Sequence, residues 1–357
     1  MYALVLFCMF PLFRASQLKK LGVYDYFIDE SSPLIYNNRL LMFESVVRAS
    51  PSWAGNWLPS FSKCDSYYRV RDMRTLLVLV NITSTCNHAF GAATVFTDVS
   101  GRDTILITGT PWDRTISPSR LTWSGPCSGS ATSCSVDMFW SSSLGLEDAT
   151  WASRAPGVSL AGVGVYNNDV MRVPSSMDSS FVWAMALETT SERARFAVSM
   201  DADPRNVSAW ALLPPNATVP SLPDTGSCPS LRSDGTHFYY LTGGMDISIL
   251  RSKDLVVWEA AQRKVLLHGD PGDCIIAPAW FGPYLPSEEA QKRLSDCGVT
   301  GNFGDDSDVD LVEWPSSFGD GSVATLIQYG SGDQRTFGFS NLALFNGTMN
   351  SFLQSFF

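Results

Sequence analysis

The chain has 357 residues and a formal net charge of −10, with 25 Lys and Arg against 35 Asp and Glu. Hydrophobic residues make up 45% of the chain and charged residues 17%, a balance that provides a core and excludes an intrinsically disordered protein. The basic residues are scattered, so no patch could hold a phosphate backbone, and nucleic acid is excluded as a partner.

The N-terminal stretch MYALVLFCMFPLFR holds an apolar run that is too short to cross a bilayer as a helix. Its length suits the h-region of a signal peptide, so we expect residues 1–16 to be a signal peptide and the protein to be secreted. Because no basic residue precedes the run and the cleavage site lacks a small residue at one position, an N-terminal anchor stays open. No second long apolar segment follows, and no transmembrane span is expected.

Glycosylation acceptors support the same compartment. Four N-x-S/T tripeptides without a central proline begin at Asn81, Asn206, Asn216 and Asn346. We therefore expect a glycoprotein.

The eight cysteines also fit an oxidising compartment. Cys8 lies in the expected signal peptide, and local spacing suggests the disulfides Cys64–Cys86, Cys127–Cys134 and Cys274–Cys297. Cys228 is then left over. With no CxxC pair and only three His in the chain, no zinc site is expected.

The rest of the chain reads as short strands between Gly, Asn, Asp, Ser and Pro. In chain order the clearest are 34–45, 104–110, 181–189, 237–243 and 324–330. Helical periodicity is confined to a short segment at 286–294. An all-β fold is therefore predicted.

A repeated phrase links several of these strands: a serine, a polar turn and then an aromatic residue. The phrases end at Trp151, Trp210 and Trp258, and the C-terminal segment offers Phe352 in the same place. The units start near Asp29, His88, Asp169, Cys228 and Asp308, roughly 60 or 80 residues apart, as expected for propeller blades.

The fold class predicted is a single five-bladed β-propeller over residues 17–357. The blades are expected at about 24–84, 85–160, 161–215, 226–285 and 305–357. In a propeller the innermost strands begin at one rim of the central channel, so polar side chains at blade starts meet in one pocket. These starts carry the candidate site residues.

Four of these starts also carry a resemblance. The phrases DESSPLIYNNRLLMFES, NNDVMRV, CPSLRSDGTHFYYLTG and DSDVDLVEW resemble the five-bladed propeller glycosidases of the arabinanase, levansucrase and invertase superfamily, in the style of families 43 and 32. The resemblance covers about residues 24 to 357. It implies a carbohydrate partner and three carboxylates that divide acid and base roles, because one must be protonated while another is ionised.

Carried over by position, the resemblance places the first-blade carboxylate at Asp29 or at Glu30, with Asp29 favoured, and the third-blade carboxylate at Asp169, beside Asn168. Both carboxylates also have a structural interpretation as local caps of backbone N–H groups. Where invertase-like enzymes have a Glu directly before Cys-Pro, this chain has Ser227. The expected general acid is missing.

Three replacements for the acid are open. His88 could donate a proton or act as a structural hydrogen-bonding residue. Asp308 and Asp310 alternate along a strand and should point to one face, where two like charges would raise one pKa, or where they could hold a cation or water. Arg172 is expected to pair with a carboxylate, and Gln334 to shape a loop over the pocket.

Two functions follow from the sequence. The first is a secreted glycosidase that uses Asp29 and Asp169 with an acid from Asp308, Asp310 or His88. The second is a carbohydrate-binding propeller that has lost the acid, as Ser227 indicates. No cofactor is expected in either case, and a structural cation in the channel stays open.

Overall fold

The structure, a computed structural model, describes most of the strand-rich part of the chain. The described residues are 18–26, 28–47, 66–86, 88–111, 134–160, 165–189, 194–214, 228–243, 246–262, 267–268, 273, 307–315, 323–331 and 339–357. The expected signal peptide at 1–16 and the expected helix at 286–294 lie outside these residues.

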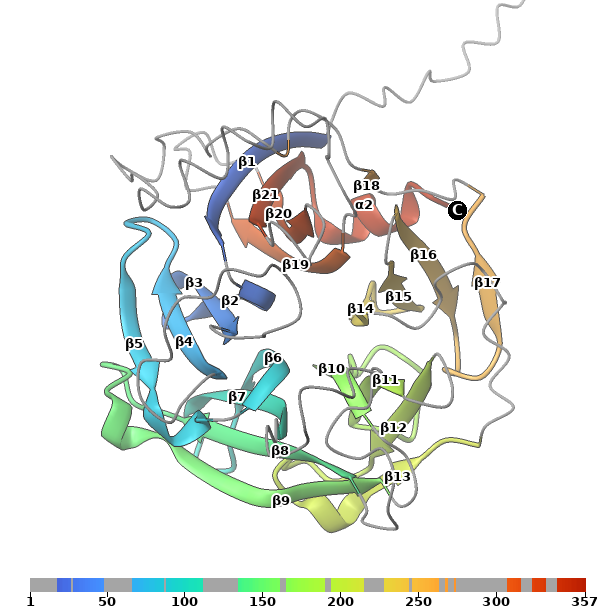
Figure 1. Ribbon diagram of the computed structural model, residues 1–357. Coiled ribbons are helices and arrows are strands. Elements are labelled where there is room, and N and C mark those ends of the chain that lie inside the picture. Colours follow the sequence, from blue (N-terminus) through green and yellow to red (C-terminus); the bar gives the residue numbers. More distant parts are fainter. Residues whose placement is uncertain are drawn as a thin grey trace, which may run out of the picture.

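Five antiparallel sheets stand around a central axis, which confirms the predicted five-bladed β-propeller (Figure 1). The first sheet contains β2 (Ile28–Tyr36), β3 (Arg39–Val47), β4 (Ser66–Asp72) and β5 (Val78–Ile82). The second contains β6 (His88–Thr97), β7 (Asp103–Pro111), β8 (Cys134–Ser141) and β9 (Ala152–Leu160). The third contains β10 (Val165–Arg172), β11 (Trp183–Thr189), β12 (Arg195–Ser199) and β13 (Trp210–Leu212).

The fourth sheet contains β14 (Ser230–Ser233), β15 (Phe238–Thr242), β16 (Asp246–Ser252) and β17 (Trp258–Ala260), and β18 (Leu267–His268) pairs with β16. The fifth contains β19 (Ser307–Pro315), β20 (Val323–Ser331), β21 (Phe339–Asn346) and β1 (Leu18–Tyr26). Short helices are η1 (Thr83–Thr85), η3 (Asp148–Thr150), η4 (Val207–Ala209) and α2 (Met349–Gln354). No described helix is long and apolar enough to cross a membrane.

The N-terminal strand closes the ring. β1 pairs with β21 from Leu18↔Phe345 to Tyr26↔Phe339, so the two ends of the chain share the last sheet. The sequence-based division, which starts the first blade near residue 24, did not include this strand in the fifth blade. Closure of this kind joins the two ends of the chain in one blade and gives the fifth blade its outermost strand.

Buried charges reinforce the closure between the fifth and first blades. On β4, Arg69 donates to Asp25 of β1 at 2.8 Å, and Arg71 donates to Glu44 of β3 at 2.6 Å. Arg69 also bonds Glu44, and Arg71 also bonds Asp25. Because Glu44 and Arg71 are almost fully buried, their charges need the compensation that this network provides.

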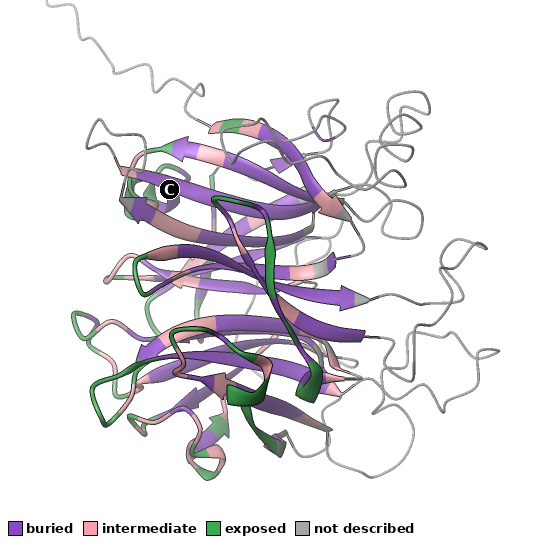
Figure 2. Cartoon of the chain, turned by 90° about the vertical axis from the view of Figure 1, so that its left-hand side faces the viewer, coloured by how far each residue is buried: buried purple, intermediate pink, exposed green. Residues whose placement is uncertain are grey.

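The blades pack on one another through apolar side chains. Five buried clusters fill the five interfaces, for example one that joins Leu41 of the first blade to Ile107 of the second. In the side view, buried residues run along the strands, and exposed residues gather at the turns and the outer edge (Figure 2). The stacked sheets therefore position the innermost strands rigidly around the axis.

The repeated serine-to-tryptophan phrase has the same structure in three blades. The serine hydroxyl that opens each phrase accepts the backbone N–H two residues later, at 3.2 Å in all three: Ser141, Ser199 and Ser252. The tryptophan that ends it is buried where the outermost strand begins: Trp151, Trp210 and Trp258. In the fifth blade β1 supplies the outermost strand, so the expected counterpart, Phe352, lies in α2 instead.

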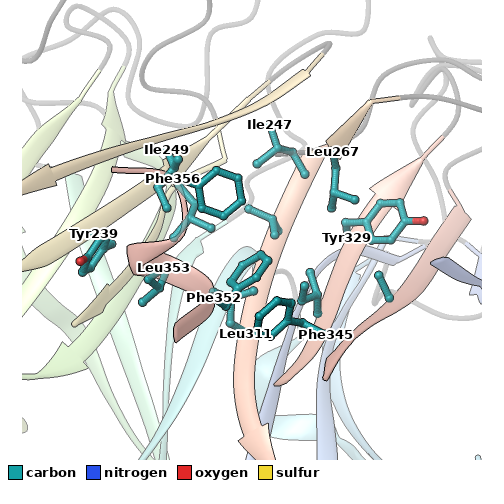
Figure 3. Packing of buried hydrophobic residues seen from close by; sticks show 14 of the residues in the cluster. Tyr239, Ile247, Ile249, Leu267, Leu311, Tyr329, Phe345, Phe352, Leu353 and Phe356 are labelled. Atoms are coloured by element: carbon teal, nitrogen blue, oxygen red, sulfur yellow. The ribbon is translucent and has the colours of Figure 1, made fainter. Parts of the chain in front are cut away.

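The C-terminal helix seals the interface between the fourth and fifth blades (Figure 3). Phe352, Leu353 and Phe356 are buried there against strands of both blades. Gln354 donates to Asp234 at 3.0 Å, and Glu313 accepts the backbone N–H of Met349 at 2.8 Å. Burial alone would raise the pKa of Asp234, but the hydrogen bonds it accepts outweigh burial and hold that pKa well below its usual value.

Removal of the Phe352 ring should weaken the whole propeller. Phe352→Ala leaves a cavity in a buried cluster, and we expect it to lower the free energy of unfolding by about 3–5 kcal/mol. Urea denaturation measures the change. Leu144→Ala, at a 73% exposed position, is the control and should change stability by less than about 0.5 kcal/mol; equal effects of the two variants would contradict the role of α2.

Candidate functional site

A cavity at the axis collects residues from all five blades. It holds about 290 Å³ of space that is partly open to solvent. The innermost strands β2, β6, β10, β14 and β19 surround it (Figure 1). Each blade contributes at the start of its innermost strand: Glu30, Ala92, Asp169, Ser230 and Asp310 line the cavity, one from each. This is the convergence that the propeller prediction required.

Irregular backbone at these strand starts aims the side chains inward. Register shifts interrupt β2, β6, β10 and β19 near their first residues. Three non-glycine residues at the starts have left-handed backbone: Phe90, Cys228 and Asp308, with φ of 55°, 49° and 51°. Such conformations are costly and persist only where the surroundings impose them, often at binding sites.

The bulge in β19 changes the geometry expected for its two aspartates. Ser307 pairs with Gly330 and Asp310 with Gln328, so three steps on β19 face two on β20. Asp308 and Asp310 therefore do not follow simple alternation, although both line the cavity. Both aspartates lie at the cavity, but the bulge replaces the simple alternation from which their common direction was predicted.

Arg232 of β14 is a cation that binds two of the aspartates lining the cavity. It donates to Asp169 at 2.7 Å, pairs closely with Asp310, and donates to the carbonyl of Leu311 at 3.2 Å. Asp169 and Asp310 are almost fully buried, and the Arg232 side chain is 14% exposed. Arg232 thereby joins the third, fourth and fifth blades.

Backbone donors complete the coordination of both aspartates. Asp169 accepts the N–H of Val170 at 2.8 Å and that of Leu231 at 2.6 Å, and Asp310 accepts the N–H of Leu311 at 2.6 Å. Backbone N–H groups and the guanidinium thus hold both carboxyl groups in fixed orientations. Asp169 and Asp310 are therefore positioned to orient and balance charge at the cavity.

Another carboxyl group, that of Glu188 of β11, lies beside the cavity. It accepts the backbone N–H of Cys228 at 3.0 Å, and Cys228 lines the cavity. Burial raises the pKa of Glu188 to about 7, the hydrogen bond from Cys228 opposes this, and the charge of Asp308 adds to it. Glu188 is thus a carboxyl that keeps a proton close to neutral pH.

Neither Glu188 nor Arg232 was predicted from the sequence, because the candidate carboxylates were expected at the residues that open each blade. Glu188 is the penultimate residue of the second strand of the third blade, and Arg232 lies in the CPSLRS phrase. A signal for Glu188 exists in hindsight, because a glutamate ends the otherwise apolar run FVWAMALET. The phrase containing Arg232 offers no comparable signal.

Cys228 is a free cysteine, as the cysteine spacing predicted. Burial raises the pKa of its thiol well above the ordinary value, and the charges of Asp308, Glu188 and Glu30 add to this. The thiolate, which is the reactive form, is therefore suppressed. A role for Cys228 as a nucleophile does not fit these surroundings.

This predicts an inert thiol in the folded protein. Iodoacetamide at pH 8 should leave Cys228 unmodified in the native state and should alkylate it after unfolding in urea. Peptide mass spectrometry reads the modification at this one cysteine. Rapid alkylation of Cys228 in the native protein would contradict the burial and charge environment described above.

His88 and Arg172 are not brought into the cavity wall. His88 contacts Asp137 through Nε2 at 3.0 Å and the carbonyl of Cys86 through Nδ1 at 3.2 Å, and its ring packs edge-on against Phe139. Both ring nitrogens are engaged, which fits the structural interpretation of His88. Arg172, which was expected to pair with a carboxylate, is exposed at the end of β10, and it is Arg232 that pairs with Asp169 on that strand.

The remaining candidates divide between the cavity and parts of the chain that the structure does not describe. Glu30 and Asn168 line the cavity. Asp29 lies in β2, but its side chain is outside the described part, as are Ser227 and Gln334 altogether. The roles predicted for these three residues stay predictions.

Features tied to secretion are described in part. Cys86 is disulfide-bonded, and Cys64, its expected partner, lies outside the described residues. Asn81, Asn206 and Asn346 are exposed, and Asn216 is outside the described part. Among the described residues no group of three or more His, Cys, Asp or Glu is arranged to hold a metal ion.

Comparisons with known proteins concern the fold. No known family model and no curated protein sequence matches the chain. Similar solved structures include a mannoside phosphorylase-family (GH130) glycoside hydrolase structure, with TM-score 0.48, 10% identity and coverage of 92% of this chain and 86% of that one. Another is the RS223 β-xylosidase, with TM-score 0.44, 8% identity and coverage of 92% and 94%.

An exo-1,5-α-L-arabinanase from a bovine ruminal metagenomic library is similar at TM-score 0.42 and 8% identity, covering 90% of this chain and 94% of that one. At such identities these similarities say nothing about individual residues, so the functional argument depends on the cavity of this chain. The molecule is a five-bladed β-propeller whose solved structural neighbours include glycoside hydrolases.

Proposed function

We propose that the protein is a secreted, N-glycosylated glycoside hydrolase that cleaves a glycosidic bond of an extracellular glycan at the axial cavity. The observation that carries the proposal is the convergence of carboxyl groups from separate blades on one cavity. Glycoside cleavage needs one protonated and one ionised carboxyl on either side of the scissile bond. The exposed acceptor asparagines Asn81, Asn206 and Asn346 support glycosylation.

The roles follow from what each carboxyl contacts. Arg232 holds Asp169 and Asp310, so the chemistry falls to the other two carboxyl groups of the cavity lining. These are Glu30 of the first blade and Asp308 of the fifth blade. We assign Glu30 as the ionised group that activates water or attacks the sugar, in place of the favoured Asp29, whose side chain is not described. Asp308 faces the leaving group.

Asp308 then delivers the proton that the missing glutamate before Cys228 would have carried, and Glu188 helps to retain that proton near neutral pH. Glu188 is bonded to the N–H of Cys228 and interacts electrostatically with Asp308. Two carboxyl groups that interact keep one proton longer than an isolated carboxyl would. Glu188 therefore acts through Asp308 as a positioning residue, and its effect should be visible in the pH profile.

The pH profile tests this assignment. Cleavage of an aryl-glycoside by the wild type should fall as pH rises through about 7, where Glu188 loses its proton. Glu188→Gln should cleave more slowly, and its rate should no longer fall as pH rises through about 7. The exposed Glu259→Gln should keep both the wild-type rate and the wild-type decrease. A Glu188→Gln profile that matches the wild type would remove Glu188 from the mechanism.

The same raised pKa has a consequence for stability. A carboxyl whose pKa is higher in the folded state stabilises the fold below its unfolded pKa, and that contribution is lost as pH rises through the folded pKa. Wild-type stability should therefore fall between pH 4.5 and about 7 by at most about 3 kcal/mol. In Glu188→Gln this decrease should be absent, which separates the ionisation of Glu188 from its role in catalysis.

A non-catalytic carbohydrate-binding propeller is the second candidate. It is favoured by Ser227, which replaces the family acid, and by Arg232, which engages two of the four cavity aspartates and glutamates. In that case the wild type would bind glycans and cleave none, at any pH. Product analysis on the same glycosides distinguishes the two candidates.

A further inference from the structure

Two consecutive asparagines of the third blade face the cavity together. Asn167 and Asn168 both line it, and they are only 7% and 4% exposed. Neighbouring residues in a regular strand point to opposite faces, so one of the two would ordinarily turn away. The register shift between Val165 and Asn168 in β10 removes that alternation and presents both side chains to the axis.

The contacts of the two amide groups fix their orientation. Asn168 donates through Nδ2 to the carbonyl of Phe90 at 3.0 Å, and Asn167 donates through Nδ2 to the sulfur of Cys228 at 3.4 Å. The Oδ1 atom of each amide therefore points away from the partner that its Nδ2 contacts. Both Oδ1 atoms are buried and have no hydrogen-bond partner among the described residues.

Buried carbonyl oxygens of this kind are normally satisfied, and an unmet pair at a cavity indicates a ligand that brings donors. No Lys, Arg or His is among the described residues that line the cavity, and the nearby guanidinium of Arg232 is already engaged by Asp169 and Asp310. Glu30 and Asp308 add two further carboxyl groups. An acidic ligand would meet repulsion here, whereas hydroxyl groups would find acceptors.

We propose that Asn167 and Asn168 determine specificity by accepting hydrogen bonds from two adjacent hydroxyl groups of an uncharged sugar. The inference rests on the sugar binding in the proposed function, but it does not require cleavage. It excludes uronic and sialic acids as the ligand in this cavity. An unsubstituted pair of neighbouring ring hydroxyls is the feature that the two amides recognise.

The test uses saturation-transfer NMR and titration with defined methyl glycosides. The uncharged probes are methyl α-L-arabinofuranoside, methyl β-D-xylopyranoside and methyl β-D-mannopyranoside, and the acidic probes are glucuronate and N-acetylneuraminate. The wild type should bind at least one uncharged probe and neither acid. Binding of an acid in preference, or of none of the uncharged probes, would overturn the proposal.

Variants and deoxy ligands then locate the recognition. Asn167→Leu keeps the size of the side chain and removes the acceptor, so the bound glycoside should bind about tenfold more weakly. Asn167→Asp keeps an acceptor oxygen and should retain binding, and Asn346→Leu at an exposed site is the control. Unchanged binding in Asn167→Leu would contradict the assignment.

Deoxy analogues of the ligand test the same contacts in the unmodified protein. Each of the two analogues that lack one of the two hydroxyls should bind the wild type about tenfold more weakly, and one of them should lose little further affinity in Asn167→Leu. Losses that simply add in the variant for both analogues would overturn the contact. Binding with this pattern but without cleavage would uphold the inference and refute the hydrolase.

Discussion

Arg232→Leu should cost the protein about 3–5 kcal/mol of unfolding free energy, because it leaves Asp169 and Asp310 as buried charges without their cation. Urea denaturation followed by tryptophan fluorescence measures the loss. The reason for so large an effect is the burial of the two aspartates: an unpaired carboxylate in a protein interior lacks both water and a counter-charge.

The control is an arginine in a similar ion pair at the surface. Arg102, which is 68% exposed, pairs with Asp98 at 3.7 Å, and Arg102→Leu should change stability by less than about 1 kcal/mol. Adding Asp169→Asn and Asp310→Asn to Arg232→Leu should restore part of the loss, since the charges are then gone. If Arg232→Leu is as stable as the wild type, Arg232 does not hold the cavity wall together.

Glu30→Gln and Asp308→Asn should each reduce cleavage by about 10²–10⁴-fold, the range by which a positioned acid or base accelerates such a reaction. Both changes keep the shape of the side chain and remove its ability to exchange a proton. Glycan binding should persist in both variants, because their side chains still offer an oxygen to a ligand. Initial rates on an aryl-glycoside provide the measurement.

The matched control for these two variants is Glu259→Gln. Glu259 is 60% exposed and pairs with Arg251 on the outer part of the fourth blade, away from the cavity lining. It should cleave at the wild-type rate. A wild-type rate in Glu30→Gln as well would show that the reaction does not use the cavity carboxyls.

The fold was predictable because each blade repeats local signals. The turn at Asn37 and Asn38, both in left-handed backbone, joins β2 to β3 as a short hairpin, and serine-opened turns recur in three other blades. Ring closure by β1 was not predictable in the same way. It pairs residues from the two ends of the chain, and no local pattern records such a contact.

The candidate site was predictable in outline, because the innermost strands of a propeller begin near its axis. Glu30, Asn168, Asp169, Asp308 and Asp310 do line the cavity. The assignment of roles was not predictable, because it depends on Arg232 and on Glu188, which come from other positions of neighbouring strands.

His88 shows that a polar residue at a blade start need not line the cavity. It opens the second blade as expected, yet it pairs with Asp137 of β8 instead of facing the axis. The direction of a side chain near a bulge depends on backbone detail that alternation rules do not supply. The same detail explains why Asn167 was overlooked while its neighbour was noted.

The most direct test of the central claim, that the axial cavity is a glycan-cleaving site, is product release from a panel of aryl-glycosides and neutral polysaccharides by the wild type and by the Glu30→Gln/Asp308→Asn double variant. We expect the wild type to release sugar from at least one member of the panel, and the double variant to bind that member without releasing product. Product release by the double variant at the wild-type rate, or binding without release by the wild type, would contradict the claim.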